Sequence, residues 1–252
     1  MLAAQRRDLL LDRLRAEGRL IAKDLAAELG LSEDSVRRDL RELAAAGLCQ
    51  RVYGGALPVS PAVADYAARA HVAVDSKRRV AAAAAGLVRP GSTLILDGGT
   101  TALMVAQALP RDLRATVVTH SPTVAVALVD HPEIEIYLLG GRLFKHSVVT
   151  CGAAAGEAAQ TVTADLFLLG VTGVHHDTGL TTGDADEAAM KRTLARRAAD
   201  TFVLASAEKI GAASPFTVLP LSAVSGIITD AATTDPTIER LQAADVTVVR
   251  AS

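Results

Sequence analysis

The chain of 252 residues is long enough for one large domain or two, and half of its residues are hydrophobic although only 3% are aromatic and none is Trp. Its core must therefore consist of Ala, Val and Leu. The net charge of -2 excludes nucleic-acid binding through bulk positive charge, and the two cysteines, Cys49 and Cys151, indicate neither a disulfide framework nor a metal site.

The first residues are typical of an amphipathic helix rather than of a signal peptide. No apolar run reaches the length of a membrane span. We therefore expect a cytoplasmic protein without a membrane partner.

Three helices are predicted at the start of the chain. The first is Gln5 to Glu17, and Leu25 to Leu43 is predicted as a helix, a tight turn and a second helix. Gly30 can adopt the left-handed conformation that ends a helix, and Ser32 can cap the next one. The apolar residues of this pair recur at helical spacing, at Leu25, Leu29, Val36, Leu40 and Leu43.

The polar face of the second helix in this pair offers hydroxyl and guanidinium groups to a DNA major groove. We predict that DNA is contacted there by Ser32, Ser35, Arg37, Arg38 and Arg41. A short hairpin over Leu48 to Gly55, with Gly18 to Leu20 as a third strand, predicts a wing that places Arg51 and Tyr53 against the phosphate backbone. The alternative is an ordinary helical hairpin with a solvated basic face, since look-alikes of this motif are common. Residues 1–57 have a net charge of only +1, so any DNA affinity must come from where the arginines point.

The segment after the wing contains Pro58 and Pro61 and has no periodicity, so we predict a linker over residues 58–75. From residue 76 onwards, apolar strands alternate with Ala-rich helices, which predicts an open, mostly parallel sheet with helices on both faces. Helices are predicted at Ser76–Val88, Ala102–Leu109 and Asp186–Ala199. The predicted strands are Thr93–Leu96, Thr116–Val118, Ile134–Leu139, Asp165–Leu169, Phe202–Ala205, Gly226–Ile228 and Val246–Val249.

The predicted organisation is thus an α/β protein with three parts. Residues 1–57 form a winged helix-turn-helix domain, residues 58–75 a linker, and residues 76–252 a Rossmann-like α/β domain for effector binding and oligomerisation. Ligands of such sheets bind at the carboxyl ends of the strands.

The run Asp97, Gly98, Gly99, Thr100 and Thr101 joins a predicted strand to a predicted helix. Glycines let backbone amides converge, threonines add hydroxyl donors, and the helix start adds partial positive charge. This arrangement can bind a phosphate or a carboxylate. A tight strand-to-helix turn without a ligand is the alternative.

Other strand ends offer similar small and polar residues, which suggests one shared pocket. Glu187 and Lys191 are four apart on a predicted helix, and with Lys209 they suit a phosphorylated sugar or polyol. A surface ion pair is the alternative for Glu187 and Lys191. The remaining residues predicted for this pocket are His120, Gly141, Gly170, Thr172 and Gly173. His175 and His176 are adjacent and lack further Cys or His partners, so we expect a solvated loop and no metal.

The residues SEDSVRRDLRELAAAGLCQRVYGGA resemble the helix-turn-helix signature and wing of the DeoR family of bacterial transcriptional regulators. Further along, the run LDGGTT, the glycine-containing strand ends, Glu187 with Lys191, and Lys209-Ile210-Gly211 are similar to its sensor domain, as is Lys77. The chain departs from the family's usual pattern at His120, where Asn is usual, and at Ala207-Glu208-Lys209.

The resemblance implies a sensor domain similar in fold to ribose-5-phosphate isomerase and CoA transferases. It also implies a repressor of sugar or polyol catabolism genes that binds double-stranded operator DNA, responds to a phosphorylated sugar or polyol, and forms a homodimer or homotetramer. We expect no enzymatic activity and no cofactor.

Two other functions remain open. Asp97, Glu187 and Lys191 could serve a sugar-phosphate isomerase with a winged-helix appendage, although a second catalytic carboxylate is missing from the late loops. A winged helix used only for protein contacts is disfavoured by the arginines of the predicted DNA-binding face.

Overall fold

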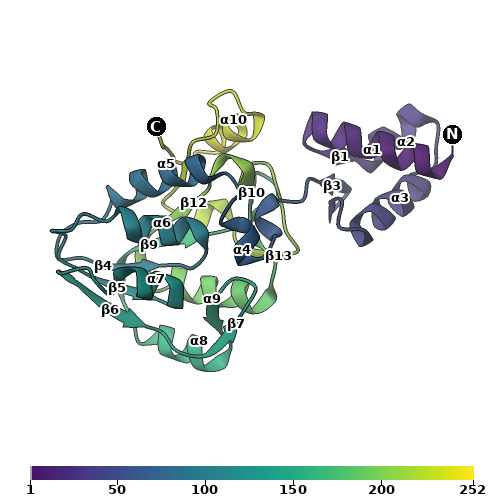
Figure 1. The fold of residues 1–252 in the computed structure, drawn as a ribbon. Coiled ribbons are helices and arrows are strands. Elements are labelled where there is room, and N and C mark those ends of the chain that lie inside the picture. The colour runs from purple at the N-terminus through teal and green to yellow at the C-terminus, as the bar shows by residue number, and fades with distance from the viewer. Residues whose placement is uncertain (1) are drawn as a thin grey trace.

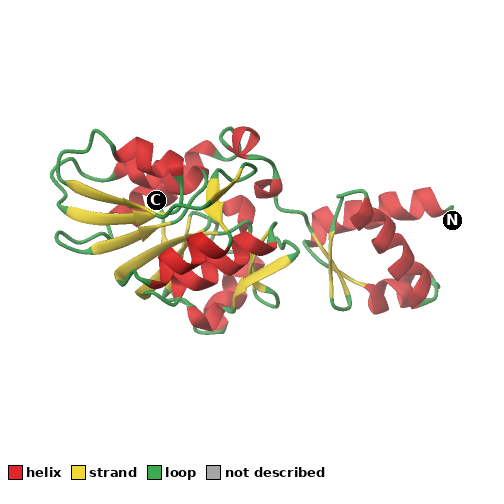
Figure 2. Cartoon of the chain, turned by 90° about the horizontal axis from the view of Figure 1, so that it is seen from below, coloured by secondary structure: helices red, strands yellow, loops and turns green. Residues whose placement is uncertain are grey.

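The computed structural model describes residues 2–252, without the side chains of residues 15, 16 and 61. Figures 1 and 2 show a small helical part at the N-terminus that stands beside a larger α/β part. No helix of the described chain is long and apolar enough to cross a membrane.

The N-terminal part contains helices α1 (Ala3–Glu17), α2 (Ala22–Leu29) and α3 (Glu33–Ala45). Strands β1 (Leu20–Ile21), β2 (Gln50–Val52) and β3 (Gly55–Leu57) form a sheet in the order β1-β3-β2. Gly30 ends α2 with a φ of +63°, and the Ser32 hydroxyl caps α3 by accepting a hydrogen bond from the Ser35 amide at 3.2 Å. These observations confirm the predicted winged helix-turn-helix.

The wing differs from the prediction in its register. The turn lies at Tyr53 and Gly54, so the hairpin runs from Gln50 to Leu57 rather than from Leu48 to Gly55. Gly55 has no room for a side chain because the backbone of Leu20 in β1 lies directly against it. The third strand therefore determines which residues form the second arm of the hairpin.

The core of this domain is separate from that of the rest of the chain, and includes Leu10, Leu25, Val36 and Leu40. The Arg6 side chain forms a paired hydrogen bond with the buried Asp39 carboxylate and so ties α1 to α3. The domain thus packs around its own apolar residues and one ion pair.

The large sheet has seven parallel strands in the order β15-β14-β12-β9-β4-β5-β6. All seven predicted strands are present, and each boundary is within four residues of the predicted one. The strands are β4 (Thr93–Leu96), β5 (Ala115–Thr119), β6 (Ile134–Leu138), β9 (Ala164–Gly170), β12 (Ala198–Leu204), β14 (Gly226–Thr229) and β15 (Val248–Arg250).

Helices cover both faces of this sheet, as predicted. One face packs against α5 (Val74–Ala85), α6 (Thr100–Ala108) and α7 (Pro122–Leu128). The other packs against α8 (Ala153–Gln160), α9 (Ala185–Ala195) and α10 (Pro236–Ala243). The prediction that the helix at α9 continues to Ala199 is wrong, because β12 already begins at Ala198 and pairs with β9 there.

Several short elements were not predicted. Strands β7 (Arg142–Phe144) and β8 (Val149–Cys151) form a hairpin, and β10 (Gly173–His175), β11 (Gly179–Thr182) and β13 (Phe216–Leu219) form a small antiparallel sheet. Short 3-10 turns lie at η2 (Ala207–Lys209) and η3 (Leu221–Ala223). These segments are too short to show a period. The strands β7 and β8, and β10 and β11, pair as local hairpins, whereas β13 pairs with β11 from an earlier part of the chain.

The segment between the two domains is also structured. It contains η1 (Pro61–Val63) and α4 (Tyr66–Arg69), and it packs onto the large domain before α5 begins. The division at residues 57 and 76 stays a prediction.

Candidate effector pocket and DNA-binding surface

The order of the strands reverses between β4 and β9. The chain proceeds from β4 to β5 and β6 on one side, and from β9 to β12 and β14 on the other. In such sheets the loops on either side of the reversal diverge and leave a crevice at the carboxyl ends of the strands.

A cavity of about 30 Å³ lies at this crevice, and we call it the effector pocket. The helix start after β4, the end of β9, helix α9 and η2 all contribute to its walls. It is lined by Ala62, Arg69, Gly98, Gly99, Thr100, Thr101, Ser147, Gly170, Val171, Thr172, Thr182, Glu187, Lys191 and Lys209.

The N-terminus of α6 points its free backbone amides at this pocket. Gly99 is the residue that precedes the helix, and its φ of +94° is a conformation that suits glycine. No described side chain caps this helix start, and Thr100 and Thr101 are the first helical residues. Uncapped amides and a helix dipole together attract an anion.

Asp97 is fully buried behind the pocket wall and accepts four hydrogen bonds. The Gly98 amide and His120 Nε2 approach Oδ1 at 2.8 and 2.7 Å, and the Gly170 amide and Lys191 Nζ approach Oδ2 at 2.8 and 2.6 Å. Burial by itself would raise the pKa of Asp97, but the charge of Lys191 and the bond from His120 outweigh it and hold this pKa well below its usual range. Asp97 therefore joins β4, β5, β9 and α9 as a carboxylate.

His120 faces acceptors with both ring nitrogens. Nδ1 lies 2.8 Å from the carbonyl oxygen of Thr150, and Nε2 lies against Asp97. The ring is fully buried and supports Asp97 instead of reaching the pocket.

The lysines of the pocket differ in how they are balanced. Lys191 lies 2.6 Å from Asp97 and 3.7 Å from Glu187. Burial opposes its charge, but the two carboxylates outweigh burial and raise the pKa of Lys191. Lys209 donates to the Thr101 hydroxyl and the Leu204 carbonyl, both at 3.3 Å, and has no ion-pair partner among the described side chains. Burial lowers the pKa of Lys209 to about 8.

Glu187 is buried and is held in place by hydroxyl groups. It accepts hydrogen bonds from Ser147 at 3.2 Å and from Thr182 at 3.4 Å. A carboxylate at this wall can accept a further hydrogen bond from a polyol hydroxyl.

Most of the predicted pocket residues lie together. Those that line the pocket are Gly98, Gly99, Thr100, Thr101, Gly170, Thr172, Glu187, Lys191 and Lys209. Asp97, His120, Gly141 and Gly173 lie outside its lining. A side chain at Gly141 would lie 2.9 Å from Ala155, and one at Gly173 would overlap the Ala212 backbone, so both glycines allow close packing.

Five lining residues were missed by the sequence reasoning: Ala62, Arg69, Ser147, Val171 and Thr182. Arg69 and Ser147 belong to short elements without periodicity, and their approach to the pocket depends on tertiary packing. Arg69 lies in the segment between the two domains, where no sequence pattern indicates a binding residue.

The predicted DNA-binding residues lie at the start of α3, on α3 and on the wing of the first domain, and all except the half-buried Ser35 are exposed. Arg38 and Arg41 are exposed on α3 and pair with no described side chain, whereas Arg37 pairs with Glu33 at 2.6 Å. Arg51 is exposed on β2, and Tyr53 is fully exposed at the tip of the wing. The Ser32 hydroxyl is used by the helix cap and by a 2.9 Å hydrogen bond with the Ser35 hydroxyl.

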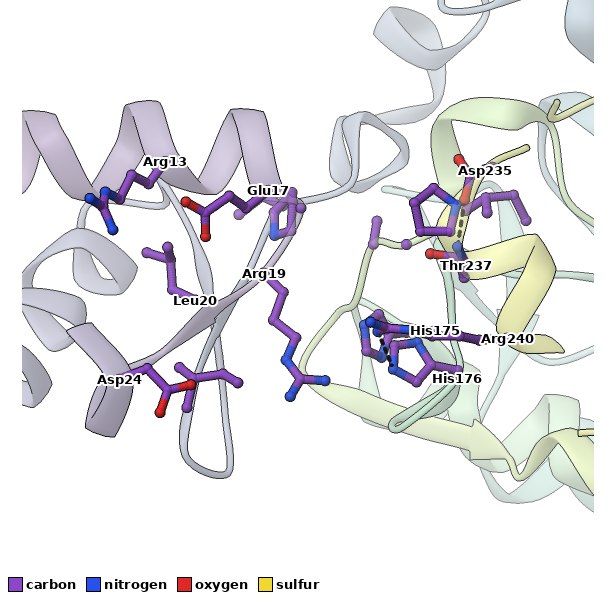
Figure 3. Close-up of a pocket in the computed structure, with 18 of the residues that line it drawn as sticks. Arg13, Glu17, Arg19, Leu20, Asp24, His175, His176, Asp235, Thr237 and Arg240 are labelled. Carbon is purple, nitrogen blue, oxygen red and sulfur yellow. Dashed lines mark hydrogen bonds between the residues drawn. The ribbon is translucent and has the colours of Figure 1, made fainter. Parts of the chain in front are cut away.

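A second cavity, of about 790 Å³, lies between the two domains (Figure 3). Arg19 on one side faces His175, His176 and Arg240 on the other. His176 Nε2 lies 2.9 Å from Arg240, and Arg19 pairs with Asp177 at 2.8 Å. Although His175, His176 and Asp177 could approach one metal ion, Arg240 already bonds to His176, Arg19 to Asp177, and His175 Nδ1 accepts from the Asp177 amide. We therefore do not regard this cluster as a metal site.

Comparison with known proteins agrees with this architecture. The profile of the DeoR-like helix-turn-helix domain matches residues 6–62, and that of the DeoR C terminal sensor domain matches residues 72–231. The HTH-type transcriptional regulator GlpR of Haloferax volcanii is 32% identical over 99% of this chain and 98% of its own length. The glycerol-3-phosphate regulon repressor of Escherichia coli K12 is 29% identical over 92% of each chain.

Among solved structures, ribose 5-phosphate isomerase A from Methanocaldococcus jannaschii covers 54% of each chain at 20% identity, with a TM-score of 0.41. This likeness is remote and adds nothing to the functional argument. The two matched domains and the full-length relatives show that this chain belongs to the DeoR family of helix-turn-helix transcriptional regulators.

Proposed function

We propose that this protein is a repressor of sugar or polyol catabolism genes that binds double-stranded operator DNA and is released by a phosphorylated sugar or polyol. The observation that supports this most directly is a winged helix joined to a buried pocket whose cations are only partly balanced by carboxylates. We expect it to act in the cytoplasm as a homodimer or homotetramer, without a cofactor.

The DNA-binding part of the proposal depends on α3. Its apolar side, at Val36, Leu40 and Leu43, is buried in the domain core, so the opposite side with Arg38 and Arg41 is free to enter a major groove. Arg51 and Tyr53 on the wing are placed to contact the phosphate backbone beside that groove.

The effector part depends on the chemistry of the pocket. The uncapped start of α6 and Lys209, which forms no ion pair with a described side chain, suit a phosphate group. Glu187 suits the hydroxyl groups of a sugar or polyol. The effector can release DNA only if it prefers a conformation that binds the operator poorly. A coupling free energy of about 1–3 kcal/mol between effector binding and DNA binding would lower operator affinity by roughly 5–150-fold.

The test combines calorimetry on a panel of phosphorylated and free sugars and polyols with operator titrations in the presence of each compound that binds. Thr100→Leu should block the compound and leave DNA binding intact, which gives a repressor that cannot be induced. Thr233→Leu, at an exposed threonine in a loop, is the matched control. If Thr100→Leu still binds the compound and releases DNA like the wild type, the phosphate site is elsewhere.

The isomerase alternative makes a different prediction. Proton abstraction needs a carboxylate that is free to approach the substrate, but Asp97 is enclosed by four donors, which leaves only Glu187. Turnover of sugar phosphates by the purified protein would support the enzyme, and its absence alongside effector-dependent DNA release would support the repressor.

A further inference from the structure

The effector pocket is covered by the segment that connects the two domains. Ser60 and Ala62 are buried, and Ala62 and Arg69 line the pocket from this side. The same segment begins directly after β3 of the wing, and its second residue, Val59, forms a parallel β-bridge with Ala213 of the large domain. We call residues 58–73 the lid.

Arg69 is buried and forms no ion pair with a described side chain. Its side chain donates to the Ser147 hydroxyl at 3.3 Å and to the His146 carbonyl at 3.4 Å, while Nε is buried and has no partner. Among the described side chains no carboxylate lies within ion-pair distance of Arg69, and burial lowers its pKa more than the charge of the nearby Glu187 raises it. A buried charge that is only partly compensated is costly, so the guanidinium group would gain by meeting an anion.

The position of Arg69 shows where that anion would bind. Its Nη1 lies 4.0 Å from the point that a side chain at Gly99 would occupy, directly beside the free amides at the start of α6. A phosphate at these amides would therefore lie within reach of the guanidinium group, which is suited to bidentate phosphate recognition.

The pocket is too small for such a ligand while the lid is closed. A volume of about 30 Å³ holds about two water molecules, whereas pockets for small metabolites usually measure about 300–1,000 Å³. Access of a sugar phosphate thus requires the lid, or the neighbouring β7–β8 turn, to move.

The lid is held by a few hydrogen bonds to that turn and to the helices. The Tyr66 amide donates to the His146 carbonyl at 2.9 Å, and His146 Nε2 donates to the Val63 carbonyl at 3.0 Å. The Tyr66 hydroxyl bonds to Thr123 at 3.1 Å, and Lys77 Nζ donates to the Arg69 carbonyl at 2.6 Å. Such bonds contribute about 0.5–1.5 kcal/mol each, which a tightly bound effector can exceed.

Direct contact between the domains does little to oppose a shift of the lid. The ion pair between Arg19 and Asp177 is half exposed, and pairs of this kind contribute about 0–1 kcal/mol. Cavities of about 790 and 350 Å³ separate the winged helix from the large domain. The position of the winged helix is therefore set mainly by the lid.

We propose that Arg69 binds the phosphate group of the effector, and that the lid carries the change in pocket occupancy to the DNA-binding domain. The proposal rests on the proposed function, since it assumes a phosphorylated effector at the start of α6. Arg69 would then be a ligand-binding residue outside the large sheet, and the lid would connect the pocket physically to the wing.

The first test measures inorganic phosphate, and each phosphorylated compound found in the panel, against the full-length protein by calorimetry. Arg69→Gln should weaken binding by roughly 10–100-fold, as expected for loss of charge-assisted hydrogen bonds, and Arg69→Lys should retain part of the affinity. Arg78→Gln, at an exposed arginine on α5, is the control and should bind like the wild type. Thermal melts confirm that each variant is folded.

The second test pins the lid. Val59→Cys with Ala213→Cys joins the two residues of the β-bridge by a disulfide, and the native Cys49 and Cys151 are buried and do not interfere. In the oxidised protein, operator affinity should no longer respond to the phosphorylated compound, and reduction should restore the response. The single Val59→Cys variant should respond in both states.

The outcomes separate this inference from the proposed function. If the wild type binds no phosphorylated compound, both are overturned. If the wild type binds one and Thr100→Leu does not, but Arg69→Gln binds with wild-type affinity, only the role of Arg69 is overturned. An oxidised double-cysteine variant that releases DNA normally would overturn the role of the lid.

Discussion

At the scale of single residues, Asp97 is the polar centre of the large domain. Asp97→Asn should lower the free energy of unfolding by about 3–5 kcal/mol, because it leaves the buried Lys191 and His120 without their anion. Urea denaturation measures this, with the exposed Asp130→Asn as the control. A loss below about 1 kcal/mol would contradict the account of the network.

The same carboxylate makes stability depend on pH in a known direction. Its pKa is lowered in the folded protein, so its contribution is fully present above the unfolded value of about 4 and is lost as the pH falls below it. As the pH falls below about 4, the free energy of unfolding should therefore decrease more steeply for the wild type than for Asp97→Asn.

Lys209 makes effector binding depend on pH at the alkaline side. Its pKa of about 8 means that it loses its charge above this pH, while a phosphate monoester is already a dianion there. Effector affinity should fall by up to about tenfold for each pH unit above 8. Calorimetry from pH 7 to about 9.5 tests this, and Lys209→Met should bind more weakly and without this pH dependence. An unchanged pH profile in that variant would assign the titration to another group.

At the scale of elements, the recognition helix and the wing should contribute differently. Arg38→Ala on α3 should weaken operator binding by about 1–3 kcal/mol and leave binding to scrambled DNA nearly unchanged, if its guanidinium group reaches a guanine edge. Arg51→Ala on the wing should weaken binding to all sequences alike and reduce the salt dependence. Titrations of both DNAs at several salt concentrations measure the difference, and unchanged operator affinity in Arg38→Ala would rule out α3 as the recognition helix.

At the scale of the whole molecule, one winged helix buries too little surface for operator-level affinity, whereas two that are related by a dyad can read two half-sites. We expect residues 76–252 alone to form at least a dimer and residues 1–57 alone to be monomeric, because we place the subunit contact on the larger, Ala/Val/Leu-rich domain. Light scattering on the two fragments measures this. A monomeric larger fragment would show that the subunit contact lies elsewhere.

The elements that were predicted from the sequence are those whose signal is local and repeated. The spacing of Val36, Leu40 and Leu43 determines which side of α3 is buried, and therefore which arginines remain in solvent. The seven strands are continuous apolar runs because both faces of a parallel sheet are covered. The small residues after β4 and β9 were identified because strand ends of such a sheet must meet at one edge.

Only the tertiary structure decided which of those polar residues face the pocket. Asp97 and His120 follow strands in the same way as Thr100 and Thr172, yet their mutual hydrogen bonds draw them behind the wall. Arg69 and Ser147 reach the pocket from short elements that exist only through packing, and no periodic pattern marks them. The sequence by itself determined the family, the sheet and the helix-turn-helix, because these follow from local spacing. The pocket lining and its lid depend on contacts between residues far apart in the chain, which local spacing does not encode.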